Sequence, residues 1–257
     1  MITQNNLNMN IILYEELSMN AHPALKTQLL DGWVLRFSDG YTKRANSINP
    51  ICQGSIPIPE KVAICEEKYT REELPTVFKL TDASPAGVDV YLDTQGYEKV
   101  TRTNFFTMQS LPLYQDICKV VLFNHIDSLW KEHFFRLNGI TDIQKILTAS
   151  AMMDNIQNTT ICAQIEADGK MVACGLCVIE RGYAGLYDIV VDSEYRQKGY
   201  GYDLCRALLT EAGKYGAKSA YLQVVAANIP AITLYKKLGY QHLYQYWYRV
   251  KDKQQIS

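Results

Sequence analysis

The residues with the clearest chemical potential form a loop between a strand-like run and a helix-like run in the second half of the chain. After the apolar run LYDIVV, residues 196–201 read RQKGYG, and an amphipathic stretch follows. Gly199 and Gly201 carry no side chain, so a ligand can approach the backbone closely. The free N–H groups and the dipole at the helix start, together with the cations Arg196 and Lys198, suit a phosphate or a diphosphate. The sequence therefore predicts a phosphate-binding loop here.

Three classes of phosphate ligand compete for such a loop. A P-loop requires GxxxxGK[ST], which the sequence lacks. A dinucleotide fold requires GxGxxG/A, but Leu204 stands where the third small residue belongs. That fold also needs an acidic residue in the next strand, and residues 221–225 contain Gln223 and no acid. Coenzyme A is the third class.

Two segments of this half together resemble the GNAT acyltransferase superfamily. Arg196-x-x-Gly199-x-Gly201 after a strand is similar to that family's pyrophosphate-binding signature, R/Q-x-x-G-x-G/A. Downstream, residues 228–240 read NIPAITLYKKLGY, which resembles the family segment N-x-x-A-x-x-x-Y-x-x-x-G-F/Y. The resemblance covers roughly residues 161–250. It implies an α/β fold with a mixed sheet, acetyl-CoA as co-substrate, and direct transfer of the acetyl group to an amine.

The same resemblance implies where acetyl-CoA would bind. The strand at residues 186–191 would part from its neighbour, and the pantetheine arm would pair with the exposed backbone of that strand. Asn228 could contact the co-substrate, although its position before Ile229-Pro230 also fits a helix N-cap. The residues expected to bind acetyl-CoA are Ile189, Val190, Val191, Arg196, Gln197, Lys198, Gly199, Tyr200, Gly201, Asn228 and Tyr235.

Transfer to an amine requires proton movements on both reactants. The amine must lose a proton to become a nucleophile, and the departing CoA thiolate benefits from a proton donor. Tyr235 matches the family tyrosine in the donor role; a tyrosine that packs on the core is the alternative interpretation. Asp188, in the parting strand, is the first candidate base, and Glu180, in the preceding strand, is the second. For both carboxylates, a surface-facing side chain is the alternative.

One pattern of strands and helices occurs twice along the chain. Gly32 and Gly175 occupy corresponding positions, as do Gly96 and Gly239, and the members of both pairs are 143 residues apart. A constant offset across several elements indicates a duplication. We therefore expect two tandem GNAT-like domains in a mixed α/β fold.

We expect the first domain to comprise residues 1–118 and the second residues 119–257. At the position where the second domain carries its phosphate-binding loop, the first domain departs from the family pattern. The corresponding segment reads INPICQGSIPIPEKV, in which Gly54 stands alone. Pro57 and Pro59 supply no N–H for a phosphate. We expect the first domain to be a degenerate copy that packs against the catalytic domain and walls the acceptor pocket.

Local signals predict several elements around these motifs. Asp168-Gly169 is typical of a hairpin turn between two strands. Trp130 and Phe134 recur at helical spacing, which predicts core packing. The stretch after the loop places apolar residues on one stripe of a helix, namely Leu204, Ala207, Leu208 and Ala212.

Composition limits the classes of partner. The chain has 257 residues, of which 47% are hydrophobic and 21% charged, as in ordinary globular proteins. Lys and Arg number 26 against 27 Asp and Glu, so no basic excess is present to hold a nucleic acid or an anionic membrane. No apolar run approaches the ~18 residues of a membrane span. We expect the acceptor to be an amine of a small molecule, such as an amino acid or its derivative, or of a protein.

Neither export nor metal binding is expected. The N-terminus lacks the cationic region and cleavage site of a secretion signal, and the seven cysteines are scattered, so reduced thiols in the cytoplasm are expected. Cys174 and Cys177 have CxxC spacing but lie in a run typical of a buried strand, where residues three apart point to opposite faces. A zinc site would need a second pair, and neither that pair nor HExxH occurs.

Two other functions would use some of the same residues. A non-catalytic acyl-CoA sensor or regulatory module would need the loop but not Tyr235 or a base, so the presence of Tyr235 favours an enzyme. A dinucleotide oxidoreductase would bind NADH in place of acetyl-CoA. Serine hydrolysis is poorly supported because GxSxG is absent.

Overall fold

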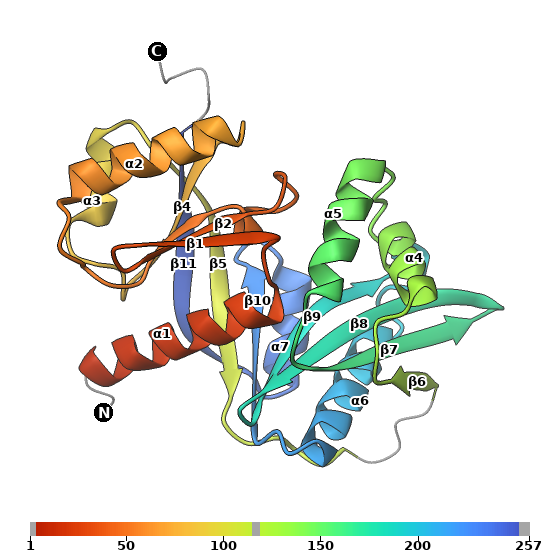
Figure 1. Cartoon of the computed structure of the whole chain (residues 1–257). Coiled ribbons are helices and arrows are strands. Elements are labelled where there is room, and N and C mark those ends of the chain that lie inside the picture. The colour runs from red at the N-terminus through yellow and green to blue at the C-terminus, as the bar shows by residue number, and fades with distance from the viewer. Residues whose placement is uncertain (1–3, 115–118, 252–257) are drawn as a thin grey trace. The chain divides into compact units, whose positions relative to one another are not determined.

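The computed structural model describes residues 4–114 and 119–251 (Figure 1). The chain forms two compact units: unit 1 comprises Met1–Asn104 and Tyr244–Ser257, and unit 2 comprises Phe105–Leu243. The last strand of the chain thus contributes to the unit that begins the chain, whereas the sequence repeat groups it with the second copy. The predicted domain boundary, at Cys118, lies outside the described residues.

Unit 1 is built on one mixed sheet with strand order β1-β2-β3-β4-β11-β5. The first three strands are antiparallel, β4 is parallel to β3, and β11 is antiparallel to β4. Asp31 and Gly32, with φ of 43° and 83°, form the two-residue turn between β1 and β2. The elements are α1 (Gln4–Ala21), β1 (Lys26–Leu30), β2 (Trp33–Phe37), the 3-10 turn η1 (Lys43–Ala45), β3 (Ile48–Pro50), α2 (Ile58–Arg71), β4 (Thr76–Thr81), α3 (Val88–Thr94), β5 (Glu98–Met108) and β11 (Gln241–Lys251).

Aromatic side chains fill the core on one face of this sheet. Trp33 and Tyr97 both pack edge-on against Phe78, with ring centroids 5.9 and 5.4 Å apart. Tyr69 of α2 is buried among them, and its hydroxyl donates a hydrogen bond to the Arg36 carbonyl at 2.8 Å. Helix α2 lies between β3 and β4 in the chain, and its apolar face therefore covers the sheet that contains these two strands.

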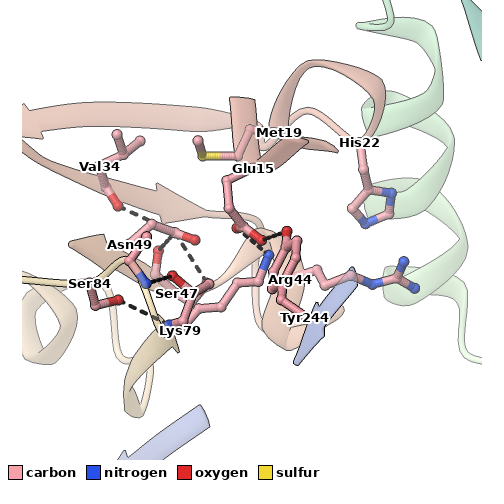
Figure 2. Close-up of polar contacts among 12 residues, drawn as sticks. Glu15, Met19, His22, Val34, Arg44, Ser47, Asn49, Lys79, Ser84 and Tyr244 are labelled. Carbon is pink, nitrogen blue, oxygen red and sulfur yellow. Dashed lines mark hydrogen bonds and ion pairs between the residues drawn. The ribbon is translucent and has the colours of Figure 1, made fainter. Parts of the chain in front are cut away.

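A buried ion pair connects α1 to the other face of the sheet (Figure 2). The Lys79 ammonium lies 2.5 Å from the Glu15 carboxylate, and each side chain is only 4% exposed. The Tyr244 hydroxyl donates a second hydrogen bond to Glu15 at 2.7 Å, and the ammonium also lies 4.0 Å from the Tyr246 ring centroid. Both charges are therefore compensated inside the unit.

Replacing Glu15 with Gln leaves the buried Lys79 ammonium without its carboxylate. We expect the free energy of unfolding to fall by about 3–5 kcal/mol, the usual cost of breaking a buried ion pair on one side. Urea denaturation measures this loss. The control is Glu16→Gln on the exposed side of the same helix turn, which should change stability by less than about 0.5 kcal/mol. Equal losses in the two variants would contradict the role given to the ion pair.

Unit 2 is also a mixed α/β unit, with strand order β5-β10-β9-β8-β7-β6. Strands β6 to β9 are antiparallel neighbours, and β10 is parallel to β9. Asp168 and Gly169, with φ of 53° and 71°, form the predicted turn between β7 and β8. The elements are β6 (Val120–Phe123), α4 (Ser128–Leu137), α5 (Ile143–Asp154), β7 (Thr159–Ala167), β8 (Lys170–Glu180), β9 (Tyr183–Val191), the 3-10 turn η2 (Ser193–Tyr195), α6 (Tyr200–Lys214), β10 (Ser219–Val225) and α7 (Ile229–Lys237).

Helices cover both faces of this sheet. Figure 1 shows α6 on one side of β7, β8 and β9, and α4 and α5 on the other. The predicted stripe of α6 is fully buried, and Leu204 and Leu208 belong to one core cluster with strand residues such as Ile165. On the other face, the Trp130 and Phe134 rings of α4 stack at 5.7 Å. The sequence correctly predicted a mixed α/β fold with these packing faces.

The cysteine pair of β8 is structural, as expected. Cys177 lies in the core cluster beneath α6, and Cys174 alternates with Ala173, which belongs to the same cluster, so the two sulfurs point to opposite faces. Burial raises the pKa of both thiols well above the usual range, which keeps them unreactive. Across residues 4–114 and 119–251, no group of three or more His, Cys, Asp or Glu side chains is arranged to hold a metal ion. No described helix has the length and apolarity needed to span a bilayer.

Candidate active site

The two parallel strands at the centre of unit 2 pair along only part of their length. The β9–β10 register runs from Tyr183 opposite Ser219 to Leu186 opposite Leu222 and then ends. Strand β9 nevertheless continues to Val191 and β10 to Val225. The backbone of β9 beyond Leu186 therefore faces a gap on its β10 side, as the resemblance to the GNAT family implied for this strand.

A β-bulge lies just beyond the last pair of these strands. Tyr187 is opposite Leu176 and Val190 is opposite Cys174, so Asp188 and Ile189 together face Gly175 alone. Asp188 has a φ of 53°, the left-handed region that few residues other than glycine adopt. A Cβ on Gly175 would lie 2.6 Å from the Ile189 side chain, so glycine is needed there for the bulge to close against α6.

The two residues of the bulge, Asp188 and Ile189, direct their side chains to different faces of the sheet. Ile189 points toward α6, because its side chain and that of Leu204 in α6 both border the point that a Cβ on Gly175 would occupy. Asp188 lies on the other face, since its negative charge, after burial, is the main factor that raises the pKa of the Cys174 thiol. Asp188 and Ile189 therefore lie on opposite faces of β9.

A cavity of about 660 Å³ lies between the end of β9, the following loop and α7. Ten of the eleven residues expected to bind the co-substrate line it, and Lys198 does not. The Lys198 ammonium instead lies 4.5 Å from the ring centroid of Tyr195. The lining residues are Ile189, Val190, Val191, Tyr195, Arg196, Gln197, Gly199, Tyr200, Gly201, Tyr202, Asn228, Pro230, Ala231, Leu234, Tyr235 and Lys237.

The loop at one end of the cavity presents unpaired backbone donors. In the part of the chain that the structure describes, the N–H groups of residues 197–201 donate no hydrogen bond. Gly199 is the N-cap of α6 with a φ of 90°, and no side chain caps this helix. The first two N–H groups that are satisfied, those of Tyr202 and Asp203, both donate to the Gly199 carbonyl. Five N–H groups in the loop and at the start of α6 can therefore donate hydrogen bonds to a bound anion.

Two cations border the same cavity. The Arg196 guanidinium is held by a hydrogen bond of 3.2 Å from its Nε to the Val191 carbonyl. The Lys237 ammonium lies 4.7 Å from the Tyr202 ring centroid, beside the first turn of α6. Sequence reasoning identified Arg196 but missed Lys237. The helical spacing of Pro230, Leu234 and Lys237 along α7 could have revealed it, because residues four and three apart share one face.

The wall opposite the loop is α7. Its N-cap is Asn228, whose side chain accepts a hydrogen bond from the Ala231 N–H at 3.3 Å while also lining the cavity. Tyr235 is 8% exposed and packs edge-on against Tyr240 at 6.1 Å. Its hydroxyl forms no hydrogen bond to any described residue. Burial, followed by the nearby Cys205 thiol, raises the pKa of Tyr235, so the hydroxyl stays protonated near neutral pH.

The two candidate bases lie outside this cavity. Asp188 is on the opposite face of β9, next to the residues that line it. Glu180 lies at the β8–β9 turn, where it accepts a hydrogen bond from Asn158 at 3.2 Å and pairs with Arg181 at 3.3 Å. These contacts give Glu180 a role in holding the turn.

Comparison with known proteins agrees with the geometry. Residues 124–240 match the family model for the acetyltransferase (GNAT) family. The chain is 28% identical over 250 residues to the uncharacterized N-acetyltransferase YobR of Bacillus subtilis. This alignment covers 92% of this chain and 97% of that protein. It is 36% identical over 77 residues to the [ribosomal protein bS18]-alanine N-acetyltransferase of Escherichia coli, which covers 30% of this chain and 52% of that protein.

Solved structures share the fold. A GCN5-related N-acetyltransferase from Kribbella flavida matches with a TM-score of 0.68 at 14% identity, covering 93% of this chain and 95% of that one. A tandem GNAT protein from the clavulanic acid biosynthesis pathway matches with a TM-score of 0.59 at 14% identity, covering 75% and 69%. The match to the family model, together with the loop and the parted strands, makes residues 124–240 similar to the GNAT family of acetyltransferases.

Proposed function

We propose that this protein transfers the acetyl group of acetyl-CoA directly to a primary amine of a small molecule or a protein. Residues 119–257 form the catalytic domain of this proposal, and residues 1–118 form a degenerate GNAT-like domain. The observation that carries the proposal is the cavity whose loop offers five unpaired backbone N–H groups beside a parted strand.

The phosphate end of the co-substrate fits the loop. A diphosphate accepts hydrogen bonds from backbone N–H groups at a helix start, where the helix dipole also favours negative charge. Gly201 supports this fit, because a Cβ there would meet only Leu234 and Val191 at 3.4 and 3.6 Å, so its backbone lies at the cavity wall. Arg196 and Lys237 add positive charge at the same end. Lys198, although it does not line the cavity, remains a candidate for a looser contact.

The amide-bearing arm of the co-substrate fits the parted strand. Ile189, Val190 and Val191 line the cavity on the side where β9 has no β10 partner. An extended chain with amide groups can pair with such a strand as an additional strand would. This pairing would direct the thioester toward the point where β9 and β10 separate.

Tyr235 is the proposed proton donor. When the amine nitrogen bonds to the acetyl carbon, the carbon–sulfur bond breaks and a thiolate leaves. The Tyr235 hydroxyl donates its proton to that sulfur, and its raised pKa ensures that the proton is present at neutral pH. Packing against Tyr240 holds the ring, so the core-packing and proton-donor interpretations are compatible.

Asp188 is the proposed base. Its side chain lies on the face of β9 opposite the cavity, within one residue of the strand segment proposed to hold the arm. An amine that approaches from this face can give its proton to Asp188, directly or through water, before it attacks. The two reactants would then meet at the bulge from opposite faces of the sheet.

Assay of acetyl transfer tests the proposal. The full chain is incubated with acetyl-CoA and a panel of amino acids, amino-acid derivatives and peptides with free amines, including peptides that begin with alanine, since one relative is named for acetylating alanine of a ribosomal protein. Release of free thiol and a product heavier by one acetyl group are expected for at least one acceptor class. Tight acetyl-CoA binding with no product over the whole panel would favour the sensor function, and binding of NADH alone would overturn the proposal.

Replacing Tyr235 with Phe removes the hydroxyl and keeps the ring. We expect kcat to fall about 100-fold with little change in KM for acetyl-CoA, because a positioned general acid contributes roughly this factor. Wild-type kcat should not decline between about pH 7 and 10, since a tyrosine with a raised pKa acts below that pKa and keeps its proton there.

Tyr215→Phe is the matched control for this prediction, because Tyr215 is 47% exposed and lies at the far end of α6. It should leave kcat unchanged. Full turnover in the Tyr235→Phe variant would remove the assignment of the general acid.

Replacing Lys237 with Ala should weaken acetyl-CoA binding about 10-fold or more, because the loss of one charge-assisted contact to a phosphate costs about 1.5 kcal/mol or more. The dissociation constant should also rise less with added NaCl than in the wild type, because one cation fewer is screened. Isothermal titration at low and high salt measures both effects. The neighbouring Lys236, exposed and outside the cavity, is the control, and Lys236→Ala should bind as the wild type does.

A further inference from the structure

Unit 1 contains a loop equivalent to the phosphate-binding loop of unit 2. Residues 53–56 follow strand β3 and precede helix α2, as residues 196–199 follow β9 and precede α6. In unit 2 the N–H groups of this loop are unpaired. In unit 1 they are not: the Ser55 N–H lies 2.8 Å and the Ile56 N–H 2.7 Å from the carboxylate of Asp31. The Ser55 hydroxyl donates a further bond to the same carboxylate at 3.1 Å.

A buried cation completes this arrangement. Lys61, in the first turn of α2, has a side chain that is 0% exposed, and its ammonium lies 2.9 Å from the Asp31 carboxylate. It also donates to the carbonyls of Asp31 and Gln53 at 2.9 and 2.6 Å and lies 4.7 Å from the Trp33 ring. A fully buried ammonium requires a negative partner, and among the residues that the structure describes Asp31 is its only salt-bridge carboxylate.

The local backbone is shaped to bring the carboxylate into the loop. Asp31 and Gly32 form the β1–β2 turn with positive φ, and the Asp31 carboxylate at this turn reaches the N–H groups of Ser55 and Ile56. Gly54 has a φ of 68°, and a Cβ there would lie 2.2 Å from both the carbonyl and the carboxylate of Asp31. The lone glycine of this loop is therefore needed to admit the chain's own carboxylate.

We propose that the Asp31 carboxylate is a built-in anion that occupies the phosphate-type loop of unit 1 and closes it to phosphate ligands. The expectation from sequence was that Pro57 and Pro59 supply no N–H for a phosphate. The donors of Ser55 and Ile56 are present, and Asp31 already uses them. Unit 1 has thus kept an anion-binding loop and replaced the external anion with an internal one.

The charge state of Asp31 is consistent with this role. The N–H groups of Ser55 and Ile56, and then the Lys61 ammonium, hold the pKa of Asp31 well below its usual range. The carboxylate therefore stays ionised throughout the neutral range, and its stabilising effect is complete above about pH 4, the value of a free aspartate, and is lost only below it.

Removing the carboxylate tests the proposal. Asp31→Gly suits the positive φ and leaves two N–H donors and a buried ammonium without a partner. Equilibrium dialysis of the full chain with labelled inorganic pyrophosphate should show one more equivalent bound than in the wild type. This difference does not depend on unit 2. If acetyl-CoA and pyrophosphate fail to bind to unit 2, the proposed function fails, but the Asp31→Gly variant should still bind one equivalent of pyrophosphate and the wild type none.

Asp39→Gly is the matched control, because Asp39 also precedes a glycine in unit 1 and has a φ of 49°. It should bind as many equivalents as the wild type. A folded Asp31→Gly variant with wild-type stoichiometry would overturn the proposal. If this variant unfolds in dilute buffer, its folded fraction by circular dichroism should recover with added pyrophosphate but not with chloride at equal ionic strength, and no recovery would equally overturn it.

Discussion

The β-bulge at Asp188 and Ile189 is the constraint on which the candidate site depends. Two residues of β9 share one partner, Gly175, so the strand bends directly after its last pair with β10. The bend leaves backbone of β9 free along the cavity and turns Asp188 to the opposite face. A β9 in regular register would continue to pair with β10, and no gap would remain for an extended ligand between the two strands.

Both units meet the same physical requirement at the start of a helix. The first N–H groups of a helix have no partner within it and need an acceptor from elsewhere. Unit 1 supplies a carboxylate from its own β1–β2 turn and buries a lysine against it. Unit 2 supplies nothing from within its described residues and keeps these groups at a cavity wall. The proposed division between a degenerate and a catalytic domain follows from this difference.

The cavity residues combine structural and chemical roles. Asn228 caps α7 and lines the cavity, as the two interpretations of its position allowed. Tyr235 packs in the core and still borders the cavity, and the burial that raises its pKa is what would keep its proton available. A side chain fixed by packing loses little freedom when a ligand binds, which suits a group that must meet one atom of a substrate.

The sequence by itself determined the features that depend on neighbouring residues or on a short motif. The Asp168-Gly169 turn, the buried stripe of α6 and the opposed Cys174 and Cys177 follow from nearby residue types and periodicity. The ten expected residues that line the cavity follow from two short motifs through the resemblance to the GNAT family.

Only the tertiary structure decided that Lys198 turns to Tyr195, that Lys237 borders the cavity, that Asp31 fills the loop before α2, and that β11 pairs with β4. The reason is that these outcomes depend on contacts between segments far apart in the chain or on the direction of a single long side chain, which neither backbone propensity nor spacing specifies.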